Sequence, residues 1–160
     1  MTPLASAIAS RCKRVRAGLA VGFDTFDFEE LRSVRGGVWE ASGAEGGLPF
    51  EDRQFDVVAI DRRSVSRESI LEVYRVLTPD GSMFFTVDER TRKQPGFTAP
   101  EVYKMVREGF DILELRRPKW WTFGRGGRTM TVCARKKAWR EHRGLVREGG
   151  VTLAPFRSMK

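Results

Sequence analysis

Two short runs that are apolar on both faces constrain the fold of this chain more than any other feature. Residues 17–23 read AGLAVGF and residues 55–61 read FDVVAID. A run of this kind is typical of a buried strand in a parallel sheet, because helices cover both faces of such a sheet. The two runs therefore predict an α/β protein in which residues 17–23 and 55–61 are neighbouring, buried, parallel strands.

Helical patterns alternate with strand patterns along the rest of the chain. Amphipathic or capped segments predict helices over residues 3–13, 25–34, 66–77 and 99–109. Further strands are predicted over residues 38–41, 82–88, 110–115 and 129–135. No helix fits between the last two strands, which predicts an antiparallel pair. The predicted architecture is a three-layer α/β/α sandwich with a mostly parallel, Rossmann-type sheet and an antiparallel C-terminal hairpin.

Length and composition are those of one folded domain. The chain has 160 residues, of which 41% are hydrophobic and 31% are charged. Strong apolar anchors become scarce after residue 137, so we assign residues 1–137 to the α/β domain and residues 138–160 to a basic C-terminal tail. No apolar run approaches the ~20 residues that a membrane-spanning helix requires, so no membrane partner is predicted.

The few cysteine and histidine residues exclude several kinds of site. Cys12 and Cys133 are the only cysteines, and His142 is the only histidine. We predict no zinc site, no other metal and no histidine-based triad. Two distant thiols are typical of reduced cysteines in a cytoplasmic protein. The basic residues near the start follow the apolar stretch, which is the wrong order for a secretory signal, although an organelle transit segment stays open.

The chain carries a large excess of positive charge. Its formal net charge is +8, and much of the excess lies in the last third. Aromatic and basic residues interleave there, which favours RNA or another polyanion as a partner, because rings stack on bases and cations neutralise phosphates. The candidate contacts are Arg116, Arg117, Lys119, Trp120, Trp121, Arg125 and Arg128, followed by Arg135, Lys136 and Lys137. The alternatives are a solvated basic surface and a hairpin that covers the sheet edge or lines a substrate cavity.

Several phrases in the chain resemble a known family when they are taken together and in order. They are LPFEDRQFDVV from residue 48, RVLTPDG from residue 75, EGFDILEL from residue 108 and VCARKK from residue 132. This ordered set resembles the class I S-adenosylmethionine-dependent methyltransferases of the small-molecule type, over roughly residues 17–137. The resemblance implies their fold and S-adenosylmethionine as the cofactor.

The resemblance also implies candidate cofactor contacts. The phrase VGFD resembles the family's VGVD, whose acid holds the ribose hydroxyls, and this implies Asp24 together with Gly22. In SGAEGGLPF, Ala44 stands where the family has an adenine-contacting acid, Glu45 is one place displaced, and Leu48 follows. The residues themselves allow another interpretation of Asp24, which is the N-cap of the following helix. No catalytic residue can be named from the sequence.

One part of the family pattern has no counterpart here. The family opens with a strand and a glycine-rich loop that lets the backbone approach the methionine part of the cofactor. Nothing of this kind precedes residue 17, so the chain is predicted to be N-terminally truncated relative to the family. A sheet does not keep an empty slot, because unpaired buried backbone groups are costly. Residues 17–23 are therefore expected to slide into the central position beside residues 38–41, unless a second copy or another partner chain completes the sheet.

The missing loop leads to two hypotheses about function. In the first, the protein is a degenerate, non-catalytic scaffold or RNA-associated module that binds S-adenosylmethionine weakly or not at all. In the alternative, it is an active S-adenosylmethionine-dependent methyltransferase of unknown substrate, since methyl transfer depends mainly on positioning and needs no obligatory acid–base pair.

Overall fold

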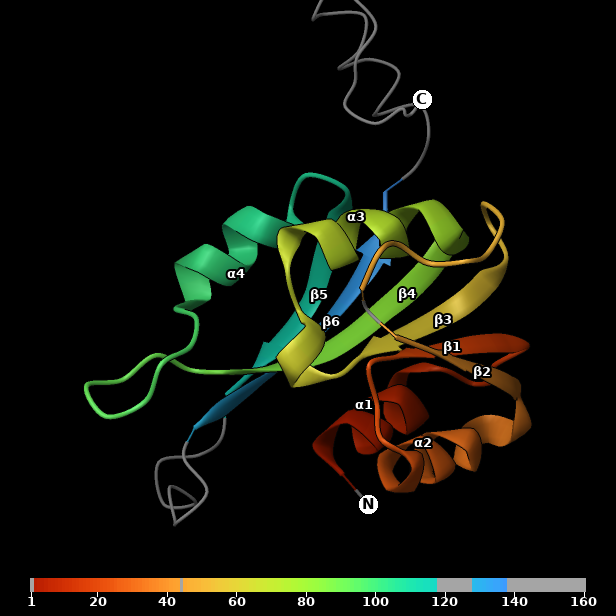
Figure 1. Ribbon diagram of the computed structural model, residues 1–160, viewed down its shortest axis with the longest axis horizontal. Helices are drawn as coiled ribbons and strands as arrows, with labels where there is room; N and C mark the ends of the chain where they lie inside the picture. The colour runs from red at the N-terminus through yellow and green to blue at the C-terminus, as the bar shows by residue number, and fades with distance from the viewer. Residues whose placement is uncertain (1, 44, 118–127, 138–160) are drawn as a thin grey trace, which may run out of the picture.

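The computed structural model describes residues 2–43, 45–117 and 128–137 (Figure 1). Its helices are α1 (Pro3–Arg11), α2 (Thr25–Arg32), α3 (Arg67–Val76) and α4 (Ala99–Val106), with two short 3-10 helices, η1 (Val34–Gly36) and η2 (Arg62–Ser64). Its strands are β1 (Ala17–Val21), β2 (Val38–Ser42), β3 (Phe55–Ile60), β4 (Leu77–Asp88), β5 (Phe110–Arg116) and β6 (Thr129–Lys136). The predicted tail, residues 138–160, lies outside the described residues.

The strands form one sheet in the order β2-β1-β3-β4-β6-β5. β1 pairs in parallel with both β2 and β3, with Leu19 opposite Glu40 on one side and Val58 on the other. The prediction that residues 17–23 and 55–61 form neighbouring parallel strands is confirmed. Because β1 pairs directly with β3, no partner strand lies between them, and β1 lies beside residues 38–41 as expected. The truncation relative to the family stays a prediction.

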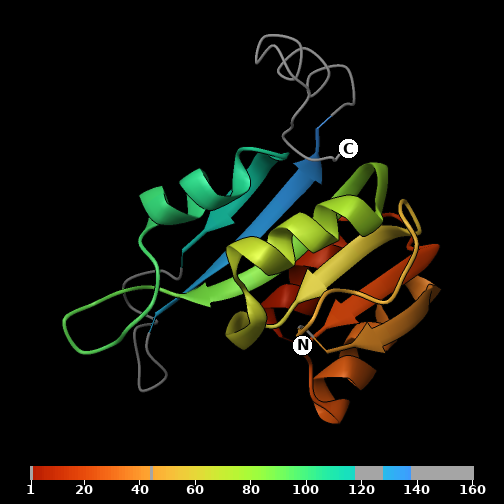
Figure 2. The same ribbon diagram turned by 45° about the horizontal axis from the view of Figure 1, so that its top comes forward.

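The last two strands form the antiparallel part of the sheet. β6 runs antiparallel to β4 on one side and to β5 on the other. The predicted C-terminal antiparallel pair is therefore confirmed. Figure 2 shows β5 and β6 at one end of the sheet, far from α2.

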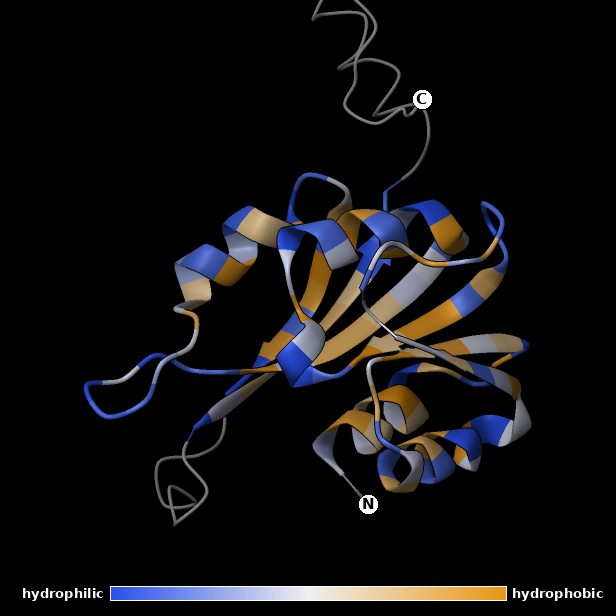
Figure 3. Ribbon diagram, viewed as in Figure 1, coloured by the Kyte–Doolittle hydropathy of each residue, from blue (hydrophilic) through white to orange (hydrophobic). Residues whose placement is uncertain are grey.

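Helices cover both faces of the sheet and create two hydrophobic cores. α1 and α2 cover one face, where Ile8 and Leu31 pack with Trp39 and Phe84. α3 and α4 cover the other face, where Val73 and Val102 belong to the larger core. Figure 3 shows that the strands between these layers are mostly hydrophobic. This arrangement explains why β1 and β3 are apolar on both faces.

Local sequence signals explain where two of the helices begin. Ser66 and Thr98 each form a capping box. Their side chains accept from the backbone N–H groups of Ser69 and Glu101, and the side chains of these two residues accept from the backbone N–H groups of Ser66 and Thr98. Such reciprocal bonds satisfy N–H groups that have no partner inside the helix. The predicted helices over residues 3–13 and 99–109 end earlier than expected, at Arg11 and Val106.

The segment TPDG, predicted as a turn before a strand, is a bulge within β4. Leu77 pairs with Phe55, and the next paired residue of β4 is Ser82, opposite Val57. Asp80 adopts a left-handed conformation with φ 64°. The pairing on both sides of the bulge makes β4 one long strand.

Two further expectations concern the whole chain. None of the helices in the described ranges is long and apolar enough to cross a membrane. Cys12 and Cys133 are both free thiols, half-buried and buried respectively.

Candidate functional site

The carboxyl ends of β1 and β3 form the switch point of this sheet. From β1, the chain continues to β2 on one side, while β3 lies on the other side. In open α/β sheets, ligands bind outside the carboxyl ends of the strands at such a point. The segments that leave these ends are residues 22–24 and residues 61–64, so they define the place where a cofactor would be expected.

Gly22 follows β1 directly and is covered by the protein's own Ser64. Gly22 has φ 79°, and a Cβ atom at this position would lie 2.0 Å from the Ser64 Oγ atom. The N–H of Gly22 donates to the carbonyl oxygen of Ser42 at 2.8 Å. The N–H of Asp61 donates to the carbonyl oxygen of Val21 at 2.9 Å. The end of β1 is thus tied to both neighbouring segments, and the space above Gly22 is filled by a side chain.

Asp61 anchors η2 at this closed point. Its side chain is buried and accepts hydrogen bonds from the backbone N–H of Arg63 at 3.1 Å and from Arg63 Nε at 2.8 Å. These bonds hold η2, and Ser64 with it, beside the end of β1. The position that a Cβ atom would take at Gly22 is therefore filled by a side chain of the same protein.

Asp24 caps helix α2. Its carboxylate accepts a hydrogen bond from the N–H of Asp27 at 2.9 Å, which confirms the N-cap interpretation. Burial raises the pKa of Asp27, and the negative charges of Asp24 and Asp61, which lie near the end of β1, raise it further. The ribose contact implied for Asp24 stays a prediction. Within the described ranges, no group of three or more His, Cys, Asp or Glu side chains could hold a metal ion.

A cavity of about 250 Å³ lies beside the switch point, next to the end of β1. It is lined by Val21, Gly46, Gly47, Leu48, Glu68, Ser69 and Glu72. Of the predicted cofactor residues, Leu48 lines this cavity, Gly22 and Asp24 do not, Glu45 is exposed, and Ala44 lies outside the described residues. The structure therefore does not gather the implied set around one space.

One of the two carboxylates in the cavity wall is already engaged. Glu72 accepts hydrogen bonds from the N–H of Leu48 at 2.9 Å and from Arg75 Nε at 3.0 Å, and the bond from Arg75 lowers the pKa of Glu72. Glu68, by contrast, is exposed at the rim. Sequence reasoning missed both residues, because the helical pattern of residues 66–77 distinguishes only an apolar face from a polar one.

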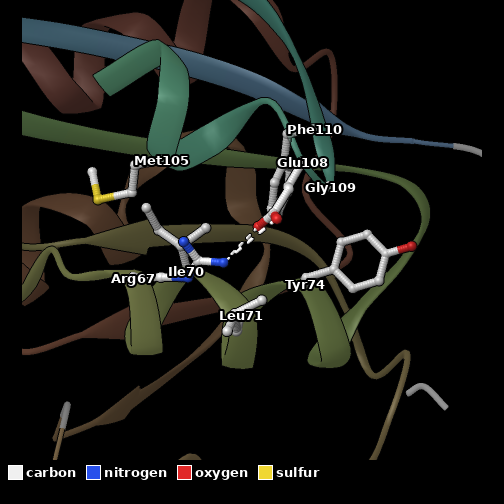
Figure 4. Close-up of a pocket in the computed structure, with 8 residues that line it drawn as sticks. All are labelled: Arg67, Ile70, Leu71, Tyr74, Met105, Glu108, Gly109 and Phe110. Atoms are coloured by element: carbon white, nitrogen blue, oxygen red, sulfur yellow. Dashed lines mark hydrogen bonds and ion pairs between the residues drawn. The ribbon is translucent and has the colours of Figure 1, made fainter. Parts of the chain in front are cut away.

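A second cleft lies between α3 and α4 (Figure 4). Arg67 and Glu108 point toward each other across it and form an ion pair at 3.1 Å. The rings of Tyr74 and Phe110 meet edge to face, with centroids 5.7 Å apart. Its volume is about 10 Å³, enough for about one water molecule. This cleft is a packing junction rather than a ligand site.

Of the predicted nucleic-acid contacts, Arg116, Arg117 and Arg128 lie within the described residues, and two of these arginines are in ion pairs. Arg116 pairs with Glu114 at 2.7 Å, and Arg117 pairs with Glu89 at 2.8 Å. The carbonyl oxygen of Arg128 accepts from the N–H of Glu89 at 2.9 Å. The remaining members of the set lie outside the described residues, namely Lys119, Trp120, Trp121 and Arg125.

Arg135 and Lys136, two of the three basic residues predicted to extend this set, differ in solvent exposure. Arg135 is exposed, but Lys136 is buried, and its Nζ donates to the carbonyl oxygen of Leu77 at 2.7 Å. The expectation that Lys136 contacts a polyanion is therefore wrong, because its amino group faces the protein interior.

Comparison with known proteins gives a fold but no sequence relative. No sequence-family profile and no curated protein matches the chain. A S-adenosylmethionine-dependent methyltransferase from Aquifex aeolicus is 14% identical with a TM-score of 0.67, over 84% of this chain and 90% of that one. The Burkholderia thailandensis 1,6-didemethyltoxoflavin-N1-methyltransferase, solved with S-adenosylhomocysteine, is 16% identical with a TM-score of 0.60, over 85% of this chain and 77% of that one.

A third similar structure is a methyltransferase from Haloferax volcanii in complex with the activator Trm112. It is 13% identical with a TM-score of 0.62, over 84% of this chain and 89% of that one. The sheet order and the two helical layers indicate the same fold as these similar structures. The chain has the fold of the class I S-adenosylmethionine-dependent methyltransferases.

Proposed function

We propose that this protein is a non-catalytic member of the methyltransferase fold, a pseudoenzyme that acts as a cytoplasmic scaffold or RNA-associated module. The single observation that carries the proposal is the contact between Ser64 and Gly22 at the switch point of the sheet. A fold hosts many functions, so the function must be argued from this site rather than from the fold.

The methionine part of S-adenosylmethionine does not fit where the fold would place it. Its binding requires a backbone that the cofactor can approach closely, and here Ser64 already occupies that side of Gly22. Each charge-assisted hydrogen bond that the cofactor cannot form removes ~1.5–3 kcal/mol, or about one to two powers of ten in affinity. Two such losses turn a micromolar binder into one of about millimolar affinity.

The nucleoside part has more room but little to hold it. The cavity beside β1 measures about 250 Å³, which is smaller than the ~300–1,000 Å³ of typical ligand pockets. Leu48 and Val21 offer apolar contact, while Glu72 is already engaged by its bonds to Leu48 and Arg75. This cavity supports at most the binding of a fragment of the cofactor.

The RNA-associated part of the proposal is supported by charge. The formal net charge of +8 attracts polyanions through phosphate neutralisation and the release of counterions. Binding of this kind is weak and sensitive to salt, and it needs no catalytic residue.

The alternative function, an active S-adenosylmethionine-dependent methyltransferase, is favoured by one observation. The cavity lies next to the end of β1 and is lined by Gly46, Gly47 and Leu48, in the loop that the family resemblance associates with adenine.

Calorimetry with S-adenosylmethionine and with S-adenosylhomocysteine tests the proposal. The expected dissociation constants are about millimolar or weaker. The variants Glu68→Gln, at the cavity rim, and Glu29→Gln, on the exposed side of α2, serve as a matched pair. Micromolar binding that Glu68→Gln weakens and Glu29→Gln does not would support the active enzyme and contradict the non-catalytic proposal.

A further inference from the structure

Many of the positive charges at the carboxyl edge of the sheet are in ion pairs, while Arg92 and Lys93 in the loop after β4 form none with the described residues. Four arginines in this region each face a carboxylate: Arg62 with Asp88 at 3.5 Å, Arg63 with Asp61 at 2.8 Å, Arg90 with Glu101 at 3.0 Å and Arg117 with Glu89 at 2.8 Å. An arginine that already shares its donors with a carboxylate gains less from a phosphate. The carboxyl edge of the sheet, which we call the mouth of the fold, is therefore a poor polyanion site in the part of the chain that the structure describes.

The opposite edge, where the parallel strands begin, keeps an excess of positive charge. Six basic side chains there form no ion pair with any described residue: Lys13, Arg14, Arg53, Arg107, Arg135 and Lys137. The carboxylates at this edge that are likewise not in such pairs are Glu51, Asp80 and Asp111. We call the six basic residues the amino-edge strip.

The sheet topology places the members of the strip in a row. Lys13 and Arg14 precede β1, Arg53 precedes β3, Arg135 and Lys137 lie at the end of β6, and Arg107 precedes β5. Lys137 Nζ donates to the carbonyl oxygen of Arg107 at 2.6 Å, which joins the last two positions. From β1 to β5 the strip crosses four strand spacings, or about 19 Å.

Arg53 occupies its place in the strip against a backbone preference. It has φ 58°, in the left-handed region that glycine adopts without strain. Its N–H donates to the carbonyl oxygen of Arg75 at 3.0 Å, but its side chain is exposed and forms no bond within the described ranges. Arg35 has a similar φ of 57°, and its guanidinium group bonds to the carbonyl oxygen of Ala9. Strained residues can mark a place where a ligand is bound. Of the three non-glycine residues with positive φ, Arg53 and Asp80 lie at this edge, and each has an exposed side chain without a bond inside the described ranges.

We propose that the amino-edge strip binds the phosphate backbone of a single-stranded nucleic acid. This inference rests on the polyanion binding of the proposed function and assigns it to a surface away from the mouth of the fold. Guanidinium groups match phosphate oxygens in pairs, and a flexible single strand can follow a row of cations along a sheet edge. The contact is to phosphate, so it carries no sequence preference and weakens steeply with salt.

Fluorescence anisotropy with a labelled 20-nucleotide oligouridine tests the assignment. The amino-edge variant carries Arg53→Gln, Arg107→Gln and Arg135→Gln. The control variant carries Arg32→Gln, Arg92→Gln and Lys104→Gln, which removes the same charge from exposed positions elsewhere. We expect the amino-edge variant to lose at least tenfold in affinity at low salt and about 2 units in the salt slope, as three lost phosphate contacts require. The control variant is expected to lose less than threefold.

Four outcomes would overturn the assignment. Equal losses in the two variants would mean that net charge alone attracts the oligonucleotide. A larger loss in a third variant, Arg116→Gln, Arg117→Gln and Arg128→Gln, would move the site to the hairpin and leave the proposed function intact. Tighter binding of the wild type to vesicles with anionic headgroups than to the oligonucleotide would replace nucleic acid by a lipid surface. Absence of any binding by the wild type at low salt would contradict both this inference and the RNA-associated function.

The single variant Arg53→Gly separates binding from folding. Glycine relieves the left-handed backbone, so the melting temperature is expected to rise, while the affinity for the oligonucleotide falls about threefold or more. A variant that is more stable yet binds less cannot owe its loss to misfolding. An unchanged affinity in this variant would remove Arg53 from the strip.

Discussion

Ser64 packs against Gly22 across the ends of two neighbouring strands, and a Cβ atom on Gly22 would lie 2.0 Å from the Ser64 Oγ atom. β1 and β3 are held in register by the pairing of Val21 with Ile60, so neither side of the contact can easily withdraw. The fold keeps a glycine directly after β1, where it brings two protein segments together.

Gly22→Ala is expected to lower the free energy of unfolding by about 2–5 kcal/mol, from the left-handed backbone and from overpacking against Ser64. Urea denaturation followed by circular dichroism measures the change. In the Ser64→Gly background only the backbone part, about 1–2 kcal/mol, should remain. If the two substitutions instead add without coupling, the contact is not what restricts Gly22.

Asp24→Ala is expected to lower the free energy of unfolding by about 1 kcal/mol, because the N–H of Asp27 loses its acceptor at the start of α2. Asp24→Asn keeps an accepting oxygen and serves as the control. Neither variant is expected to change the thermal response to S-adenosylmethionine. A rise in melting temperature with the cofactor that Asp24→Ala abolishes would instead support the ribose contact.

Lys136 gives the protein a pH-dependent stability. Burial lowers the pKa of Lys136 from 10.5 to about 8. Its Nζ donates to the carbonyl oxygen of Leu77 and lies 4.4 Å from the centroid of the Tyr74 ring. Between pH 8 and 10.5 the unfolded chain then binds more protons than the folded one, so this residue's contribution to stability rises with pH by up to about 3 kcal/mol.

The variant Lys136→Met isolates that contribution. Its free energy of unfolding, measured by urea denaturation from pH 7 to pH 10, should fall relative to the wild type as the pH rises. A difference between the two proteins that stays constant across this range would show that Lys136 titrates normally.

Trp39 carries a buried indole N–H with no hydrogen-bond partner in the described part of the chain, while its ring lies against Gly18. Trp39→Phe removes the unsatisfied donor, which costs about 1–3 kcal/mol, and also removes part of the packed ring. We expect these effects to offset, leaving the free energy of unfolding within about 1 kcal/mol of the wild type. Trp39→Ala, the control for packing alone, should cost about 3–5 kcal/mol. A loss in Trp39→Phe as large as that in Trp39→Ala would mean that the indole N–H is satisfied.

Much of the fold follows from local patterns in the chain. The apolar run of β3 could only be a strand covered on both faces, and the short link between β5 and β6 left no room for a crossover helix. Ser66 and Thr98 mark helix starts because their hydroxyl groups bond to N–H groups three residues away. These features depend on neighbours in sequence, which is why they are visible before folding.

The state of the candidate site depends on contacts between residues that are distant in sequence. No local pattern could show that Ser64 meets Gly22, that Lys136 turns inward to Leu77, or that arginines at the mouth pair with acids from other segments. The same holds for the amino-edge strip, whose members come from separate loops and become neighbours only when the sheet forms. The strand order brings together residues that are far apart along the chain. These contacts determine the balance of charge and the free space at each edge of the sheet.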